Sequence, residues 1–330
     1  KDQYKFYAEG NQVIYDGGII KNQKETAEAN EVVQQQNLEV ELYALYDRVN
    51  QLFFGALLID EQKKQNDLFQ KDIQNGIDKT KALLANGTAY RSSVDELSAQ
   101  LLQAEQARVE LEATRSSFII MLSLFINSKL SESTILQKPL SPVLAETVNR
   151  PELLSFDYQK KIYDLQGHLL DAQLRPKVSF FIQGGYGRPG LNMLSNNFAA
   201  YYIGGIKFNW NFGSIYSYKN QQHLLVINNP PIAVQKETFL FNTMMVRQQQ
   251  NSDVEKYAKL IQKDDAIISL RESVKNAASA QLENGVLSAH DYINEVDAED
   301  QARQSKILHE VQLLQSQYNY QNTMGDIKIK

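Results

Sequence analysis

Three glycines with the spacing of a phosphate-binding turn are the first residues whose types suggest chemistry. Gly185, Gly187 and Gly190 form G-x-G-x-x-G after an apolar run, as in the turn that cradles the pyrophosphate of a dinucleotide. A central parallel strand would be apolar throughout, whereas residues 177–186 mostly alternate between apolar and polar side chains. Pro189 interrupts the motif, and no amphipathic helix follows that could hold a pyrophosphate. The sequence therefore disfavours nucleotide binding.

Other catalytic or metal-binding patterns are missing from the sequence. The chain contains no cysteine, which excludes disulfides, cysteine-based metal sites and thiol catalysis. The histidines are scattered without the spacing of a metal site: His168, His223, His290 and His309. Neither the G-x-S-x-G motif of hydrolases nor a P-loop occurs. The sequence predicts a protein that is not an enzyme and that has no cofactor and no metal site.

Composition and charge narrow the class of protein further. The 330 residues include only 16 glycines and 7 prolines, which favours long helices. The formal net charge of -5 gives no basis for binding nucleic acid. The longest apolar run, residues 118–126, is about half of the ~20 residues that a transmembrane helix needs. The chain opens on strand-like residues, so we expect any targeting segment to have been removed or to lie upstream.

The strand before the glycine motif has two similar partners elsewhere in the chain. Residues 4–14 and 202–212 also alternate, with apolar and aromatic side chains on one face and mainly polar ones on the other. Segments of about ten residues with this pattern are typical of a transmembrane β-barrel, in which aromatic residues lie near the membrane interfaces. We therefore expect a lipid-facing set: Tyr4, Phe6, Val178, Phe180, Ile182, Tyr202, Ile206, Phe208 and Trp210.

The alternation of these strands has a second explanation. A soluble β-hairpin packed on helices would show the same pattern, so this alternative stays open. In the barrel interpretation, residues 185–197 are predicted to form the loop at the outer end, with the glycines making the turn.

The chain repeats itself, and the repeat predicts its organisation. Residues 13–25 resemble residues 208–222, because each has an aromatic strand end, a glycine and a polar helix start. Residues 83–100 resemble residues 281–296 around an Asn-Gly pair. Each repeat therefore predicts a strand, a very long helix, an Asn-Gly turn and a returning helix.

The repeats divide the chain into three predicted segments. The first repeat covers residues 1–130, and the second covers residues 151–330 and opens with a short helix and two strands. Between them, residues 131–150 are rich in proline and lack periodicity, which predicts irregular structure. The second long helix is expected to break near residues 228–231, where consecutive prolines cannot continue a straight helix.

The returning helices carry coiled-coil patterns. Apolar residues recur at steps of three and four or their multiples in two series: Val94, Leu97, Leu101, Ala104, Leu111, Phe118, Leu122 and Phe125, and Ile293, Val296, Ile307, Val311, Leu314 and Tyr318. The first long helix, from residue 18 to residue 84, would measure roughly 100 Å at 1.5 Å per residue. Long coiled-coil helical hairpins are therefore predicted.

Together these features resemble the TolC-type outer-membrane efflux protein family over nearly the whole chain. The resemblance is carried by YDGG at residues 15–18, Asn209-Trp210, RPEL at residues 150–153 and the segment 283–296. It implies a mainly α-helical protein with membrane β-structure. In a homotrimer, the helical hairpins would form an α-barrel across the periplasm, topped by strands contributed to a shared β-barrel in the outer membrane of a Gram-negative bacterium.

The resemblance also implies a function. The expected role is the exit duct of a tripartite efflux pump, which conducts small molecules passively from periplasm to exterior. Its partners would be a periplasmic adaptor (a membrane fusion protein), an inner-membrane transporter reached through that adaptor, and outer-membrane lipid. A type I protein-secretion channel is one alternative, and a structural coiled-coil protein that forms no channel is another. Because the family contributes four strands per protomer and this chain shows three, we expect the first repeat to be incomplete at its N-terminus.

The family's functional positions map onto the two Asn-Gly turns and the segment after the second. Adaptor-binding tips are implied at Asn86, Gly87, Thr88, Asn284, Gly285 and Val286. An asparagine precedes each glycine, so the adaptor contact should be polar. A pore constriction is implied at Asp291 and Asn294, where three copies of Asp291 would form an acidic ring.

These positions have structural explanations as well. An Asn-Gly pair can simply be a tight turn between helices. Ser288 with Asp291, like Ser93 with Glu96, has the spacing of a capping box, in which the acidic residue satisfies a helix start. Capping and gating are therefore both open for Asp291.

Overall fold

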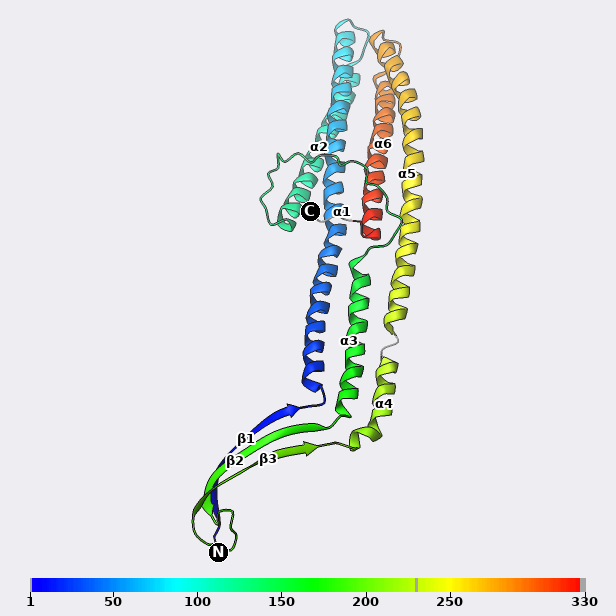
Figure 1. Ribbon diagram of the computed structural model, residues 1–330. Helices are drawn as coiled ribbons and strands as arrows, with labels where there is room; N and C mark the ends of the chain where they lie inside the picture. Colours follow the sequence, from blue (N-terminus) through cyan, green and yellow to red (C-terminus); the bar gives the residue numbers. More distant parts are fainter. Residues whose placement is uncertain (1, 229–230, 327–330) are drawn as a thin grey trace. The chain divides into compact units, whose positions relative to one another are not determined.

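The computed structural model describes residues 2–228 and 231–326. Its helices and strands follow in the order β1 (Tyr4–Tyr15), α1 (Ile19–Ala85), α2 (Arg91–Phe125), α3 (Pro151–Gln173), β2 (Lys177–Arg188), β3 (Ala199–Asn209), α4 (Gly213–Asn228), α5 (Pro231–Glu283) and α6 (Ala289–Met324) (Figure 1). The chain divides into two compact units. The strand unit comprises Lys1–Val40 and Pro151–Leu240, and the helical unit comprises Glu41–Arg150 and Phe241–Lys330. The predicted fold class, mainly helical with a few strands, is confirmed.

The sheet of the strand unit is antiparallel, in the order β1-β2-β3. Its register places Phe6 opposite Tyr186, and Phe180 between Gln12 of β1 and Ile206 of β3. Since side chains alternate along a strand, this register gathers most of the large apolar side chains on one face, while Tyr7, Phe181, Tyr201 and Ile203 lie on the other. The apolar face consists of Phe6, Phe180, Ile182, Tyr186, Tyr202, Ile206 and Phe208. The other face, called the polar face here, carries all of these polar residues: Lys5, Glu9, Asn11, Lys177, Ser179, Gln183, Lys207 and Asn209.

The apolar face is exposed along its whole length. Phe6 is 83%, Tyr202 82% and Ile206 72% accessible, and the other four members are accessible as well. A water-soluble hairpin packed on helices would bury such residues, because each large apolar side chain gains about 1.5–3 kcal/mol from burial. Within the isolated chain, the side chains of this apolar face are therefore left uncovered.

The glycine motif differs from its prediction as a turn. Gly185 and Gly187 lie inside β2, and the connection to β3 begins only after Arg188. A Cβ atom at Gly185 would stand 2.6 Å from the carbonyl oxygen of Phe6 and 2.7 Å from Cβ of Tyr7. The glycines thus allow close approach of β1 to β2 rather than a reversal of the chain. The chain continues from β2 through a loop into antiparallel β3, which is not the strand-to-helix turn of a nucleotide site.

Three helical segments pack beside one another in the strand unit. Ser155 of α3 donates to Oδ1 of Asn37 in α1 at 3.1 Å, and the rings of Phe156 and Phe239 lie 5.9 Å apart. Helix α4 ends at Asn228 and α5 begins at Pro231. The centre of the predicted break, residues 229–230, lies outside the described residues.

The main core of the helical unit joins four helices. Buried side chains of α1, α2, α5 and α6 form one cluster: Ile73, Ile77, Leu97, Ala104, Ala278, Leu282, Ala289, Tyr292, Ile293 and Val296. Gly76 of α1 makes room for the ring of Tyr292, whose Cε1 would lie 2.5 Å from a Cβ added at Gly76. The Tyr292 hydroxyl donates to the Asp72 carbonyl at 3.1 Å. A glycine inside a helix is normally unfavourable, and here close packing compensates for it.

Both predicted coiled-coil series contribute to the cores. Leu97, Ala104, Ile293 and Val296 lie in the four-helix cluster, while Val311 and Leu314 pack with Phe54 and Leu57 in a second one: Phe54, Leu57, Val311 and Leu314. Phe125, predicted to lie in the seam, is 38% accessible because α2 ends at that residue. Ile119, which is off the predicted register, is instead almost fully buried.

The irregular segment after α2 packs along α6. Tyr318 donates to the Leu140 carbonyl at 3.0 Å, and Tyr320 donates to the Ala145 carbonyl at 3.2 Å. The backbone N–H of Asn149 donates to the carbonyl of Met324 at 2.7 Å. Tyrosine hydroxyls therefore satisfy carbonyls that a segment without secondary structure leaves free. In the described part of the chain, no helix has both the length and the apolarity to cross a membrane.

A cluster of charged residues lies within the helical unit. Nζ of Lys275 lies 2.7 Å from Oδ2 of Asp72 and 2.9 Å from Oε2 of Glu299, whose side chain is only 3% exposed. Arg303 bonds Glu299 through Nε and Glu272 through a terminal nitrogen. Burial opposes the charge of Lys275, yet its bonds to the two carboxylates outweigh burial and raise its pKa. Burial likewise opposes the charge of Glu299, but Lys275 and Arg303 hold the pKa of Glu299 below its usual value.

Two neighbouring carboxyls on α6 behave in the opposite way. Burial raises the pKa of Asp300 to about 6, and the negative charges of Asp297 and Glu299 raise it further. The hydrogen bond that Nε2 of Gln65 donates at 2.8 Å acts in the opposite direction. Burial also raises the pKa of Asp297, against a hydrogen bond from Gln100. In the described residues, each of these two carboxyls bonds a glutamine amide, and neither forms an ion pair with a basic side chain. Asp300 is therefore poorly compensated when charged.

Asp300→Asn is expected to stabilise the protein at pH 8 by about 1–2 kcal/mol, after allowance for screening by solvent. Because the folded pKa lies above the unfolded one, the carboxyl favours folding below pH ~4 and loses that contribution as pH rises through about 6. Urea denaturation of both proteins at pH 4.5 and pH 8 measures the difference. The control is Asp78→Asn, an exposed carboxylate that also accepts one glutamine amide. A stabilisation equal at both pH values would contradict this account of Asp300.

Candidate functional site

The two Asn-Gly turns end α1 and α5 with the same hydrogen bonds. In the first, Gly87 N–H donates to the Leu84 carbonyl at 3.0 Å and Thr88 N–H to the Leu83 carbonyl at 2.9 Å. In the second, Gly285 and Val286 repeat both bonds, at 3.0 Å and 2.9 Å, to Leu282 and Gln281. This is the Schellman arrangement, which satisfies the last carbonyls of a helix.

Backbone conformation, rather than lack of space, requires the glycines. Gly87 has φ 77° and Gly285 has φ 67°, in the left-handed region that other residues avoid. A Cβ at Gly87 would meet no atom within 4 Å, and one at Gly285 would lie 3.9 Å from Leu83. The structure thus brings the two turns together. All six predicted tip residues are exposed.

Polar contacts hold the two turn-bearing helices to each other. Nζ of Lys79 in α1 lies 2.9 Å from Oγ of Ser279 and 2.8 Å from Oε2 of Glu283 in α5. Between the two helices that follow the turns, Nδ1 of His290 in α6 lies 2.8 Å from Oε1 of Glu96 in α2. The turns therefore form one paired surface, which we call the tip.

Asp291 takes part in the cap of α6. Ser288 is the N-cap residue, and its hydroxyl accepts from the backbone N–H of Asp291 at 3.1 Å. The same hydroxyl donates to Oδ2 of Asp291 at 2.7 Å. Asp291 and Asn294 lie on the exposed side of α6, opposite buried Ile293. Ser288 therefore caps the helix as predicted, whereas the Asp291 carboxylate bonds the Ser288 hydroxyl and remains exposed to solvent.

The capping prediction for the first repeat is wrong. Helix α2 begins at Arg91, its N-cap is Tyr90, and no side chain caps it. Ser93 already lies within the first turn, so it cannot be the N-cap residue. Measured from each tip glycine, Tyr90 is the counterpart of Ser288, and Glu96 is the counterpart of Asn294. Glu96 bonds His290 instead of a helix end.

Seven of the predicted lipid-facing residues lie exposed on the sheet: Tyr4, Phe6, Phe180, Ile182, Tyr202, Ile206 and Phe208. Val178 is half-buried. Trp210 follows the end of β3, where its Nε1 donates to the Leu174 carbonyl at 2.9 Å and its ring lies 4.7 Å from that of Phe212. The indole thus attaches the end of β3 to the segment that leads into β2.

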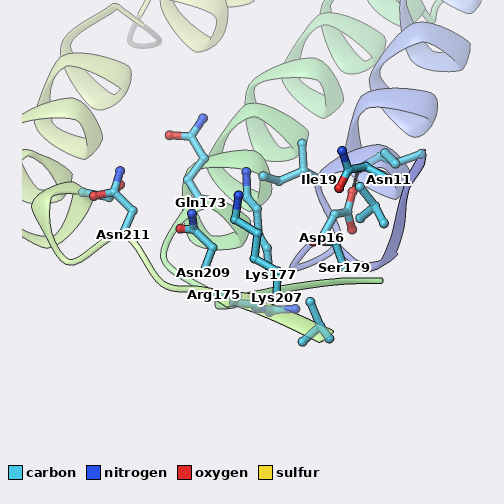
Figure 2. A pocket seen from close by; sticks show the side chains of 14 residues that line it. Asn11, Asp16, Ile19, Gln173, Arg175, Lys177, Ser179, Lys207, Asn209 and Asn211 are labelled. Atoms are coloured by element: carbon cyan, nitrogen blue, oxygen red, sulfur yellow. Dashed lines mark hydrogen bonds between the residues drawn. The ribbon is translucent and has the colours of Figure 1, made fainter. Parts of the chain in front are cut away.

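A pocket of 760 Å³ lies where the polar face of the sheet meets the helices (Figure 2). Its lining includes three basic residues, Arg175, Lys177 and Lys207, and a single acidic one, Asp16. The sequence reasoning missed this pocket. Lys177 and Lys207 could have been noted, since both fall on the polar side of alternating strands, but Arg175 lies outside any strand. Among the residues described, no cluster of histidine and acidic side chains could hold a metal ion.

No protein-family model matches the chain, and no curated protein matches it. Solved structures do. The chain is similar to the outer-membrane channel OprN, with a TM-score of 0.73 and 12% identity over 98% of this chain and 81% of that one. It is similar to the CmeC outer membrane channel of Campylobacter jejuni, with a TM-score of 0.71 and 11% identity over 98% and 78%. It is also similar to CusC, with a TM-score of 0.75 and 12% identity over 98% of this chain and 83% of that one. The chain therefore has the fold of the TolC-type outer-membrane channels, and the resemblance inferred from its sequence motifs is confirmed at the level of the fold.

Proposed function

We propose that the protein is an outer-membrane channel and serves as the exit duct of a tripartite efflux pump, conducting small molecules passively from periplasm to exterior. The observation that carries this proposal is the two-faced sheet. Its apolar face is exposed, while its other face carries lysines, amides and a glutamate beside fewer apolar side chains. A wall between lipid and water needs this arrangement. A structural coiled-coil protein would have no use for it.

The edges of the sheet support a homotrimer. Within the described residues, β1 and β3 each pair with a neighbour on one side only. Unpaired strand edges are costly in a membrane, because lipid offers no hydrogen-bond partners. Strands from other copies of the chain would satisfy these edges and close a shared barrel. Outer-membrane lipid would then cover the apolar face.

The tip supports the remaining partners. Its exposed Asn86 and the side-chain oxygens of Thr88 and Asn284, whose own donors bond Leu83 and Ala280, would face a helical periplasmic adaptor, through which an inner-membrane transporter would be reached. The positive φ of both glycines fixes the turns in one conformation, so the surface is pre-organised for docking.

Recordings from single channels in planar bilayers test the function. The detergent-extracted protein is expected to insert and give discrete conductance steps. A rod that forms no channel would stay in aqueous buffer without detergent and give no steps. That result would remove the proposed function.

The acidic constriction is proposed on the exposure of the Asp291 carboxylate, and Asp291→Asn tests it. The substitution keeps the bond from Asp291 N–H to Ser288 but removes three charges from the trimer. Cation preference and block by multivalent cations are expected to fall, because a ring of carboxylates acts on ions at short range.

The matched control is Ser288→Ala, which removes the cap and keeps the charge. It should cost about 1 kcal/mol of stability and leave selectivity unchanged. If Ser288→Ala changes the ion selectivity and Asp291→Asn does not, Asp291 acts only in the helix cap.

A further inference from the structure

The basic pocket of the strand unit concentrates positive charge where three segments meet. Arg175 lies between α3 and β2, Lys177 begins β2, and Lys207 lies near the end of β3. The register pairs Lys177 with Asn209 and Ser179 with Lys207, so the two lysines are diagonal neighbours on the polar face. Such neighbours stand about 7–8 Å apart at Cα. Figure 2 shows the three basic side chains near one another, between Asn211 on one side and Asp16 on the other.

This charge is not compensated from within the strand unit. In the part of the chain that the structure describes, Arg175, Lys177 and Lys207 form no side-chain hydrogen bond or ion pair. Asp16, the acidic member of the lining, is engaged elsewhere: its two carboxylate oxygens accept the N–H groups of Gly18 and Ile20 at the start of α1. The pocket is thus electropositive in a chain whose formal net charge is -5.

The other lining groups favour an anion too. Gln173 and Asn209 offer amide donors, and Ser179 and Ser214 offer hydroxyls, while the Asn11 amide donates to Glu9. The first residues of α1 and α4 also line the pocket. The start of a helix carries partial positive charge, which attracts anions, and here Asp16 and Asn211 already accept the N–H groups of Ile20 and Gly213. Like charges held together on a water-facing surface without partners are unfavourable unless something anionic binds there.

We propose that this pocket binds the phosphate, carboxylate or sulfonate group of small organic anions, and that it makes such anions the preferred cargo of the duct. The second part rests on the proposed channel function. A pocket of 760 Å³ has room for a small molecule beside its anionic group. Because the pocket opens on the polar face of the sheet, its ligand comes from the water-filled side. A lipid headgroup would have to come from the apolar side.

The test uses phenyl phosphate and bilayers made only of phosphatidylcholine. Phenyl phosphate should block the wild-type channel, and the double variant Lys177→Gln with Lys207→Gln should weaken block about tenfold or more, because it removes two charge-assisted hydrogen bonds to the anion. Phenyltrimethylammonium should block neither protein through this pocket. The matched control is Lys5→Gln, which neutralises a lysine of the same face at the opposite end of the sheet. It should change block less than twofold.

Each result has a distinct consequence. Equal block in wild type and double variant would overturn the proposal while leaving the channel function intact. A protein that never conducts would remove the channel function, and calorimetry of phenyl phosphate binding in detergent then decides on the pocket alone. Binding only to detergent micelles doped with phosphatidylglycerol, and not to phenyl phosphate, would assign the pocket to lipid and overturn the proposal. Should the double variant fail to fold, Lys207→Gln alone provides the comparison.

Discussion

Lys275→Met is expected to lower the free energy of unfolding by about 3–5 kcal/mol, the largest effect of any single substitution proposed for this chain. Lys275 neutralises two carboxylates at once, and one of them, Glu299, is almost fully buried. Removing the ammonium leaves a buried negative charge with only Arg303 as a partner. Urea denaturation followed by circular dichroism at pH 7.5 measures the loss. The loss should shrink at acid pH, because the lowered pKa of Glu299 means that its contribution disappears as pH falls through that value.

The control separates burial from charge. Lys64 lies 2.7 Å from Glu61, the same distance as Lys275 from Asp72, but the Lys64 side chain is 70% exposed. Lys64→Met should change stability by no more than about 0.5 kcal/mol. Adding Glu299→Leu to Lys275→Met should recover part of the loss, since a well-packed apolar pair can replace a buried ion pair. If Lys64→Met and Lys275→Met cost the same, the charged cluster has no special role.

Ile182→Arg is expected to destabilise the membrane-inserted protein by about 2–4 kcal/mol. Ile182 lies near the middle of β2, opposite Gly10 and Gly204, so in a membrane it would be far from both interfaces. An arginine there would place a charge in hydrocarbon. Unfolding by urea in liposomes, followed by tryptophan fluorescence, measures the change.

The next residue supplies the matched control. Gln183 has the same depth in the sheet but belongs to the polar face, opposite Glu9 and Ile203. Gln183→Arg should fold normally and shift ion selectivity only. Equal stability of the two arginine variants would mean that neither face contacts lipid, and the barrel proposal would then have to be abandoned.

The sequence by itself determined which elements form and in which order. Helical and strand periods are local properties, so the alternating strands and the long helices could be located without knowing any contact. The Asn-Gly turns could be located for the same reason, since only a residue that tolerates positive φ ends a helix in this way. The apolar face followed directly from the alternation, because paired strands keep their period of two.

Only the tertiary structure decided how distant residues combine. Asp72, Lys275 and Glu299 come from three helices, and no local period predicts that they meet. The packing of Tyr292 on Gly76 likewise depends on how close two helices approach.

Local signals also failed where spacing admitted two structures. The spacing of the glycine motif was compatible with a turn, but pairing with β1 places Gly185 and Gly187 inside strand β2. Ser93 had the spacing of a cap, but α2 begins earlier, at Arg91. The basic pocket required the sheet register together with the chain path from α3 into β2, which brings Arg175 to two lysines. Period and turn chemistry act over a few residues, whereas contacts between elements depend on the packing of the whole unit, which a single sequence does not display.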